Sequence, residues 1–181
     1  MAHPEQFEFV QKLRMNFGYY FVGRKVLEIG SLDINGSLRS LFIQCEYTGV
    51  DLAPGKGVDL VSLGHEVNHP DKTYDTVLSA ECFEHNPYWF ETFENMIRMT
   101  KNSGLVFFTC ATTGRQEHGT SRTDPYSSPF TVQKGWDYYK NLTEQDFREK
   151  LDFDSTFNYY GFEVDNRNND LYFWGIKATK N

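Results

Sequence analysis

Apolar side chains recur along the chain in two alternating patterns, one typical of helices and one typical of strands. Residues 4–17 carry apolar positions three or four residues apart, which predicts a helix with Pro4 in its first turn. Short apolar runs without that spacing predict strands at 25–30, 46–52, 57–63, 74–80 and 105–111. Helical patterns between them predict helices at 37–45, from Pro87 to Lys101 and at 141–151.

The end of the chain predicts two further strands, at 156–165 and 170–180. Residues 166–169 are too few for the crossover that joins parallel strands, so this pair must be antiparallel. The alternation of strands and helices predicts an α/β fold. We expect an open, mostly parallel, seven-stranded Rossmann-like sheet with helices on both faces and an antiparallel last strand.

In such a sheet, ligands bind beyond the carboxyl ends of the parallel strands. We therefore expect the loops after residues 30, 51, 63, 80 and 111 to share one face. Residues 112–140 interrupt the alternation with a polar segment that contains glycine, proline and several aromatic residues. Because a structureless loop of this length is usually functional or disordered, we interpret it as a substrate-side insertion in a single domain, 1–181.

Composition narrows the class of protein. Hydrophobic residues make up 39% and aromatic residues 17% of the chain, which favours a folded globular protein. The formal net charge is −7 without a compensating Lys/Arg cluster, which argues against a nucleic-acid partner. The three cysteines are far apart and no apolar run reaches the roughly 18 residues of a membrane span. With a polar N-terminus that is unlike a signal peptide, we expect a cytoplasmic protein without a membrane partner; the oligomeric state stays open.

Residues 26–36, with the sequence VLEIGSLDING, pose a question about the ligand. They read as a strand followed by a nucleotide-binding turn, but Leu32 and Ile34 stand where a pyrophosphate requires glycine. Glu28 also places a negative charge near such a group. S-adenosylmethionine has no phosphate and carries a sulfonium and an ammonium group, so neither objection applies to it.

Several motifs in order resemble the class I S-adenosylmethionine-dependent methyltransferases over residues 24–111. VLEIGSLDING resembles the first motif of that family, and YTGVDLAP resembles the second, in which an acid ends the second strand. The stretch YDTVLSAECFEHNPYWFETFENMIRMTKNSGLVFFTCA is similar to the fourth strand, helix and fifth strand. The G-x-G-x-G pattern of the family is not present. The resemblance implies S-adenosylmethionine as cofactor.

The resemblance also implies a cofactor site. Glu28 and Gly30 would lie near the methionine moiety, together with Ser31. The carboxylate of Asp51 would accept hydrogen bonds from the ribose hydroxyls, and Leu52 would flank the adenine. The family often has an aspartate where this chain has Leu63, so only the backbone of Leu63 could serve there. Beside the sulfonium we expect Ser79 and Ala80.

A hydroxyl acceptor would require a base, and the candidates are His118, His85 and Glu81. A surface position for His118 and a structural role for Glu81 and His85 are alternatives that the sequence leaves open. His65 and His69 have a metal-like spacing, but without an obvious third ligand we predict no metal site. Candidate pocket walls in the insertion are Tyr126, Trp136, Tyr138 and Tyr139.

The sequence therefore predicts an enzyme that moves a methyl group from S-adenosylmethionine to an oxygen or nitrogen of a small molecule. Two alternatives are a non-catalytic S-adenosylmethionine-binding protein and an NAD-linked Rossmann oxidoreductase. Leu32 and Ile34 argue against the oxidoreductase. The identity of the acceptor cannot be read from the sequence, and a protein side chain remains a second type of acceptor.

Overall fold

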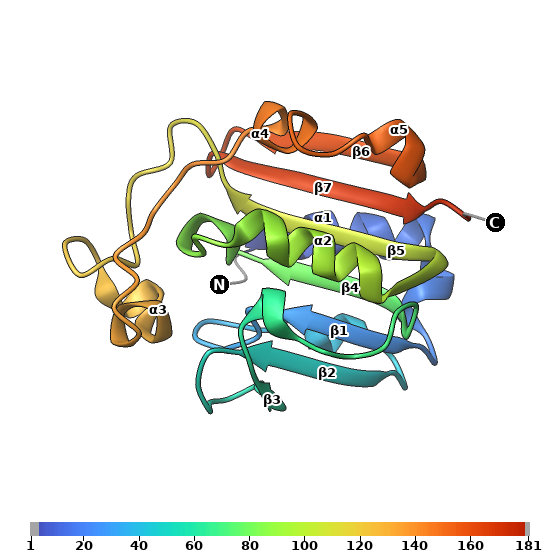
Figure 1. The fold of residues 1–181 in the computed structure, drawn as a ribbon, viewed down its shortest axis with the longest axis horizontal. Coiled ribbons are helices and arrows are strands. Elements are labelled where there is room, and N and C mark those ends of the chain that lie inside the picture. Colours follow the sequence, from blue (N-terminus) through green and yellow to red (C-terminus); the bar gives the residue numbers. More distant parts are fainter. Residues whose placement is uncertain (1–3, 180–181) are drawn as a thin grey trace.

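The computed structural model describes residues 4–179 and forms a seven-stranded sheet (Figure 1). The strands are β1 (Lys25–Ile29), β2 (Glu46–Asp51), β3 (Leu60–Val61), β4 (Tyr74–Ala80), β5 (Thr100–Ala111), β6 (Phe157–Asp165) and β7 (Asp170–Lys177). Their order is β3-β2-β1-β4-β5-β7-β6. The first five pair in parallel, and β7 is antiparallel to both β5 and β6. The predicted mostly parallel sheet with an antiparallel last strand is confirmed.

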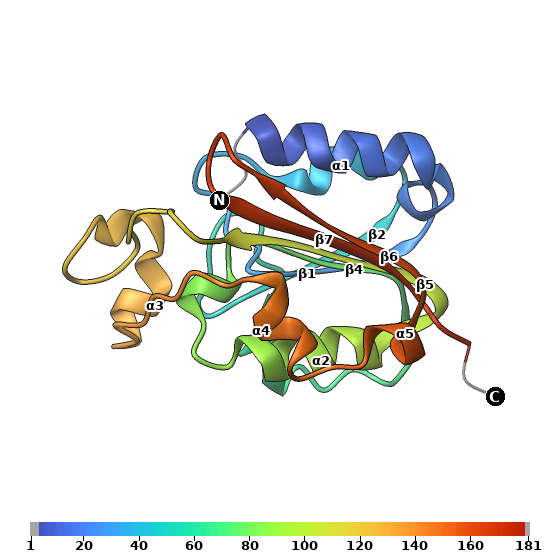
Figure 2. The same cartoon turned by 90° about the horizontal axis from the view of Figure 1, so that it is seen from above.

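Helices cover both faces of this sheet, as predicted (Figure 2). Helix α1 (Pro4–Asn16) lies on one face, and α2 (Trp89–Met99), α4 (Glu144–Arg148) and α5 (Phe153–Thr156) lie on the other. Single 3-10 turns are η1 (Gly18–Phe21), η2 (Leu38–Leu41), η3 (Gly64–Glu66) and η4 (Phe83–His85). Among residues 4–179, no helix combines the length and the apolar character needed to cross a membrane.

Aromatic packing holds α2 and α4 against the sheet. The rings of Phe108 on β5 and Phe147 on α4 stack with centroids 4.6 Å apart, and Phe93 on α2 meets Phe147 edge-on at 5.5 Å. All three side chains are fully buried. Close packing of this kind fixes the backbone of the central strands, so the loops at their carboxyl ends start from well-defined positions.

The helix predicted at 37–45 is wrong beyond its first turn. Only η2 is helical, with the Ser37 hydroxyl accepting a hydrogen bond from the Arg39 backbone N–H. Ile43 instead forms a bridge with Val22, in which Ile43 N donates to the carbonyl of Phe21 at 2.8 Å. A tertiary backbone pairing therefore overrides the local helical spacing.

Other boundaries also differ from the prediction. Helix α2 ends at Met99 rather than Lys101, because Thr100 is extended and pairs with Tyr74 of β4. Lys177 of β7 then donates to the carbonyl of Ile97 in the last turn of the helix. The strand predicted at 57–63 is reduced to β3, and the helix predicted at 141–151 to α4, which begins with the expected capping box of Thr143. Of the predicted strand 170–180, Lys180 lies outside the described residues.

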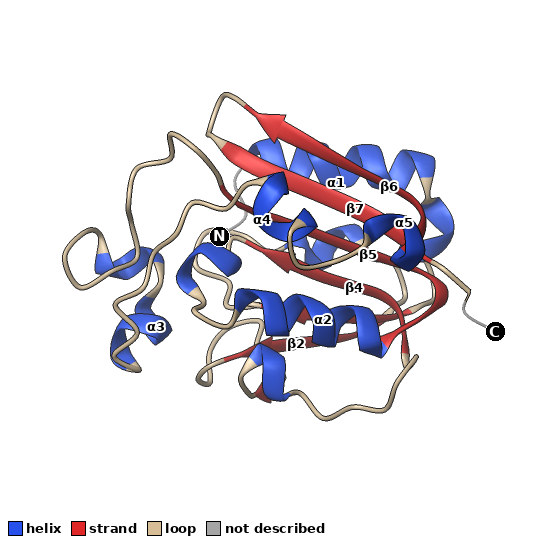
Figure 3. Ribbon diagram, turned by 45° about the horizontal axis from the view of Figure 1, so that its top comes forward, coloured by secondary structure: helices blue, strands red, loops and turns tan. Residues whose placement is uncertain are grey.

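Residues 112–140 project beyond the carboxyl ends of the parallel strands (Figure 3). They contain two short helices, η5 (Pro125–Ser127) and α3 (Pro129–Gln133), so the segment is not the structureless loop that its composition predicted. Backbone hydrogen bonds fix both of its ends: Thr112 N donates to Asn169 O, and Leu142 N donates to Ala111 O. The insertion therefore begins and ends at β5 and stands over the strand ends.

Candidate functional site

A cleft runs across the carboxyl ends of the parallel strands, on the face where the sequence places a ligand. We call it the strand-end cleft. It is lined from the loops after β1, β2, β3 and β4, and on its outer side by residues 127–131 and Trp136 of the insertion. Residues that decide its chemistry are Gly30, Leu32, Asp51, Leu52, Ser62, Glu81, Cys82, His85, Asn86 and Phe130.

A second cleft, of about 470 Å³, adjoins the first under the insertion, and we call it the loop cleft. Every residue that lines it is polar or charged: Asn35, Glu81, His85, Arg115, Gln116, Glu117, His118, Asp124 and Ser127. Glu81, His85 and Ser127 line both clefts. Two ligands bound in the two clefts would therefore meet at these three side chains.

The turn after β1 requires glycine at its first position. Gly30 has a φ of +81°, and a Cβ there would lie 2.7 Å from Cβ and 2.9 Å from Sγ of Cys82. The backbone N–H groups of Gly30 and Ser31 both donate to the carbonyl of Val50, at 2.9 and 3.1 Å. The first turn is thus held tightly against both β2 and the loop after β4.

Leu32 and Ile34, which replace the glycines of a dinucleotide turn, both line the strand-end cleft. Leu32 also packs toward Gly55, where a Cβ would lie 2.5 Å from Leu32 Cδ1 and 3.2 Å from the Phe130 ring. The space beside the turn is therefore filled by apolar side chains. A pyrophosphate cradle, which requires close approach to the backbone, does not fit here.

Asp51 ends β2 and faces the strand-end cleft, as predicted. Its Oδ2 accepts a hydrogen bond from Leu32 N at 2.9 Å and its Oδ1 accepts one from Leu52 N at 2.7 Å. Burial raises the pKa of this carboxyl, although the two backbone donors oppose the shift. Since a carboxylate oxygen has two acceptor sites, each oxygen can still accept one hydrogen bond from a ligand, which suits a vicinal diol.

Glu28 is buried behind the cleft and does not line it. Its Oε2 accepts a hydrogen bond from the Tyr47 hydroxyl at 2.8 Å. Burial raises the pKa of Glu28 to about 7, with the Tyr47 hydrogen bond acting in the opposite direction. The structure therefore gives Glu28 a protein partner, and contact between Glu28 and a cofactor stays a prediction.

Four other predicted cofactor residues also lie behind the cleft rather than in its lining. Ser31 is buried against Gly49, and the Ser79 hydroxyl donates to Ile29 O at 2.9 Å. Ala80 is part of the core under α1. The carbonyl of Leu63 accepts from both Ser62 Oγ and Glu66 N. Their positions support the loops that form the cleft.

Sequence reasoning missed several residues of the lining, among them Ser62, Cys82, Asn86 and Phe130. Ser62 adjoins the predicted Leu63, and Asn86 precedes the proline that signals a helix start. Their positions in the loops after predicted strands were therefore a signal that could have identified both residues. Phe130 lies in the insertion, whose path the sequence does not reveal. Of the predicted aromatic walls, Trp136 lines the strand-end cleft, whereas Tyr126 is 82% exposed.

The three candidate catalytic side chains come together where the clefts meet. The rings of His85 and His118 are 4.9 Å apart between centroids and edge-on, and Tyr139 packs against both at 5.6 and 5.1 Å. His118 Nδ1 lies 3.0 Å from the carbonyl of Gln116. Glu81 Oε1 accepts from Thr109 Oγ1 at 3.3 Å, and Thr109 Oγ1 accepts from Gln6 Nε2 of α1 at 3.0 Å.

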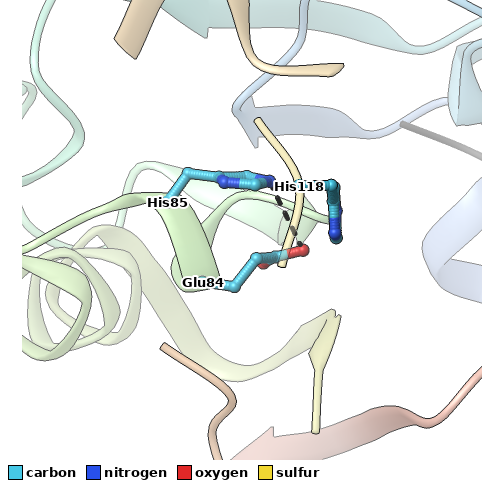
Figure 4. A group of neighbouring side chains, drawn as sticks. All are labelled: Glu84, His85 and His118. Carbon is cyan, nitrogen blue, oxygen red and sulfur yellow. Dashed lines mark ion pairs between the residues drawn. The ribbon is translucent and has the colours of Figure 1, made fainter. Parts of the chain in front are cut away.

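Burial disfavours the charged form of both imidazoles. It lowers the pKa of His85 to about 3, and it lowers the pKa of His118 in spite of the hydrogen bond to Gln116. Glu84, next to His85 on η4, is fully buried, and burial together with the nearby Glu81 carboxylate raises its pKa well above the ordinary value. Glu84 lies beside His85 and His118 but lines neither cleft (Figure 4).

Comparison with known proteins finds matches among solved structures but not among protein sequences. No protein-family model and no curated protein sequence matches the chain. Phosphoethanolamine N-methyltransferase 2 of Haemonchus contortus, solved with S-adenosyl-L-methionine, matches with a TM-score of 0.67 at 16% identity, covering 97% of this chain and 53% of that one. The CurJ carbon methyltransferase matches with a TM-score of 0.64 at 17% identity, covering 96% and 54%.

A third match spans nearly the whole length of both chains. The 1,6-didemethyltoxoflavin-N1-methyltransferase of Burkholderia thailandensis, solved with bound 1,6-didemethyltoxoflavin and S-adenosylhomocysteine, has a TM-score of 0.60 at 14% identity and covers 99% of this chain and 92% of that one. By contrast, this chain spans about half the length of the first two. These structural matches show that the chain has the fold of the class I S-adenosylmethionine-dependent methyltransferases.

Proposed function

We propose that the protein is an S-adenosylmethionine-dependent methyltransferase that acts on an oxygen or nitrogen of a small polar molecule. The observation that carries this proposal is the meeting of two clefts at Glu81 and His85. One cleft has the acid and the glycine turn suited to a nucleoside without phosphate, and the other is lined by polar and charged residues. A methyl group passing between two ligands needs this juxtaposition.

The strand-end cleft offers suitable groups for each part of the cofactor. Asp51 would bind the ribose hydroxyls with the free acceptor sites of its carboxylate. Leu52, Ser62 and Asn86 would surround the adenine, and the turn at Gly30 would hold the amino-acid end. The apolar filling at Leu32, which disfavours a pyrophosphate, also disfavours the NAD-linked alternative.

When bound, S-adenosylmethionine supplies an already activated methyl group, so the protein has to align the acceptor and exclude water. Residues 127–131 of the insertion cover the outer side of the strand-end cleft. Glu81, held through Thr109 by Gln6 of α1, offers a fixed carboxylate at the junction. These side chains would orient an acceptor toward the strand-end cleft.

The polar and charged residues that line the loop cleft favour an acceptor with several hydrogen-bonding groups over a lipid. The mixture of Arg115, Asn35 and the carboxylates offers both donors and acceptors, as a polyhydroxylated or zwitterionic molecule requires. Two of the similar structures are named as N-methyltransferases of small molecules. Their names support a small-molecule acceptor, with oxygen and nitrogen as alternatives.

Among the side chains of the protein, His118 is the best placed to accept a proton from the methyl acceptor. A carbonyl only accepts, so the ring nitrogen beside Gln116 O must be the donor, and Nε2 of His118 carries the lone pair. His85 is a weaker candidate, because burial leaves its imidazole with little affinity for a proton. Glu81 remains the third candidate.

Binding and transfer experiments test the proposal and separate it from its rivals. Thermal-shift measurements with S-adenosylhomocysteine, NAD and NADP should show stabilisation by the first alone, about 2.7 kcal/mol at 100 times its Kd. Transfer of labelled methyl from the cofactor to a pool of polar metabolites should then follow. Cofactor binding without transfer to any acceptor would support the non-catalytic alternative, and stabilisation by NAD alone would support the oxidoreductase.

A further inference from the structure

Glu84 is a buried acid that the methyl-transfer proposal does not use. Its side chain has no exposed surface, and within the described residues neither carboxylate oxygen has a hydrogen-bond partner. The residue is held in place by its backbone, since Glu84 O accepts from Lys140 N at 2.9 Å. Burying a carboxyl group without a partner is costly. Such a group indicates an interaction that the protein atoms alone do not supply.

Two imidazoles lie beside this carboxylate (Figure 4). His85 Nε2 is 3.9 Å from Glu84 Oε1, and His118 approaches from the insertion. One ligand atom from each of the three side chains lies within 4.8 Å of the others. His85 is 3% exposed, and its Nδ1 also has no hydrogen-bond partner among the described residues. Three potential ligand atoms thus face a common space.

The orientation of His118 is the one found in metal sites. Its Nδ1 donates to the carbonyl of Gln116, which leaves the lone pair of Nε2 free. Metal-ligating histidines usually donate their other ring N–H to a carbonyl or carboxylate, which fixes the tautomer and the ring. A Cβ at Gly119 would lie 2.6 Å from Cε1 of His85, so the segment that carries His118 approaches the His85 ring closely.

The charges around the three residues favour a cation. Glu81 and Asp170 lie in the same region, and Arg115 is the counter-charge, 3.3 Å from Asp170 Oδ1 and 3.9 Å from Glu81 Oε2. With Glu84 there are three carboxyl groups and one guanidinium. A cation placed beside Glu84 would favour the charged form of this buried carboxyl group, whose pKa burial otherwise raises.

From this geometry we propose that Glu84, His85 and His118 bind a divalent transition-metal ion of the Zn²⁺ type. Two imidazoles and one carboxylate form a known ligand set for zinc that leaves a fourth position open. Ligand bonds of about 2.1 Å separate the atoms of a tetrahedral site by about 3.4 Å. Side-chain rotations that shorten the present separations, which are at most 4.8 Å, by up to about 1.4 Å would complete the site.

The open position would face the loop cleft, which His85 and His118 both line. An acceptor oxygen bound to the ion would lose its proton more readily. His118 would then be a ligand, and the proton-accepting role proposed above would apply to the metal-free protein. The metal site itself does not depend on methyl transfer, since its evidence is the geometry of three side chains.

Titration of chelator-treated protein with Zn²⁺ by calorimetry, and with Co²⁺ by visible absorption, tests the proposal. We expect one ion per chain and the absorption of tetrahedral Co²⁺. Glu84→Gln and His118→Gln should each weaken binding at least tenfold, whereas the control His65→Gln, outside the cluster, should bind as the wild type does. Absence of binding, or equal binding by Glu84→Gln and wild type, would overturn the proposal.

Two controls keep this result interpretable. Thermal unfolding of the metal-free variants checks folding, and if Glu84→Gln does not fold, His118→Gln in the insertion decides the outcome. Titration with S-adenosylhomocysteine in the presence of chelator reports on the cofactor site separately. If the protein binds the metal ion but not the cofactor, the proposed function alone is contradicted. If it binds the cofactor but not the metal ion, the metal site alone is contradicted.

Discussion

Asp51 Oδ2 accepts a hydrogen bond from the backbone N–H of Leu32 at 2.9 Å, so the acid that ends β2 fixes the turn that follows β1. The same carboxylate also accepts from Leu52 N. One side chain therefore shapes the strand-end cleft and faces into it. The remaining acceptor sites of this carboxylate are the main reason to expect a ribose there.

Asp51→Ala should weaken binding of S-adenosylhomocysteine about ten- to a hundredfold, because hydrogen bonds to a charged group contribute about 1.5–3 kcal/mol. Calorimetric titration measures the effect. Asp59→Asn is the matched control: Asp59 also accepts from a backbone N–H, that of Gly49 at 2.8 Å, but does not line the cleft. Equal affinities in the two variants would contradict the role of Asp51.

Gly30→Ala should destabilise the protein by about 2–4 kcal/mol, from left-handed backbone strain together with overpacking against Cys82. Gly23→Ala separates the two causes, since Gly23 has a φ of +65° and no atom within 4 Å of an added Cβ. Urea unfolding should show a loss of about 1 kcal/mol for Gly23→Ala. Similar losses in both variants would mean that the contact with Cys82 is unimportant.

Glu28 should make folding stability depend on pH. Its pKa is raised from 4.5 to about 7 in the folded state, so the folded protein holds the proton more tightly than the unfolded chain. The contribution of Glu28 to the free energy of unfolding is therefore complete below pH 4.5. It is lost as the pH rises from 4.5 through about 7, a change of about 3 kcal/mol. Glu28→Gln should remove this pH dependence. The stability of the variant relative to wild type should therefore be higher at pH 8 than at pH 4.5.

The measurement is the difference in free energy of unfolding between Glu28→Gln and wild type across this pH range. Taking the difference cancels the other carboxyl groups. Tyr47→Phe removes the hydrogen bond that lowers the pKa of Glu28, so it should move the transition to higher pH. A difference that does not vary with pH would show that Glu28 titrates normally.

His118→Ala should slow methyl transfer about a hundredfold or more while leaving cofactor affinity nearly unchanged, since the ring lines the loop cleft alone. Single-turnover rates at saturating cofactor measure the effect once an acceptor is known. His65→Gln should retain the wild-type rate. Equal activity of His118→Ala and wild type would remove His118 from the mechanism, whether as base or as ligand.

Phe130→Ala should weaken cofactor binding about five- to thirtyfold, because its ring contributes roughly 1–2 kcal/mol of apolar contact to the strand-end cleft. Tyr126→Ala, at an aromatic residue of the same insertion that is 82% exposed, is the control. Titration with S-adenosylhomocysteine compares the two. Unchanged affinity in Phe130→Ala would mean that the insertion does not cover the cofactor.

Much of the architecture could be predicted because it follows from local patterns. The buried run of β5 and the short connection before β7 were sufficient for a parallel sheet with an antiparallel last strand. Asp51 could be placed in the cleft because it ends a strand. The helix at 37–45 was wrong because Ile43 pairs with Val22, a tertiary contact that local spacing does not encode.

The candidate site was less accessible to sequence reasoning. Glu28 and Ser79 have the expected positions in the chain, but their side chains bond to Tyr47 and to Ile29 O behind the cleft. Glu84 gave no signal, since neither its spacing nor its neighbours indicated that it would be buried beside His118. Which atoms converge across a long insertion depends on packing that one sequence does not specify.

The central claim is that a cationic nucleoside without phosphate binds across the strand ends, with its sugar held by Asp51. Calorimetric titration of wild type and Asp51→Ala with S-adenosylmethionine tests it most directly. We predict one site per chain in the wild type and an affinity at least tenfold lower in the variant. Absence of binding to the wild type, or identical affinities in the two proteins, would contradict the account.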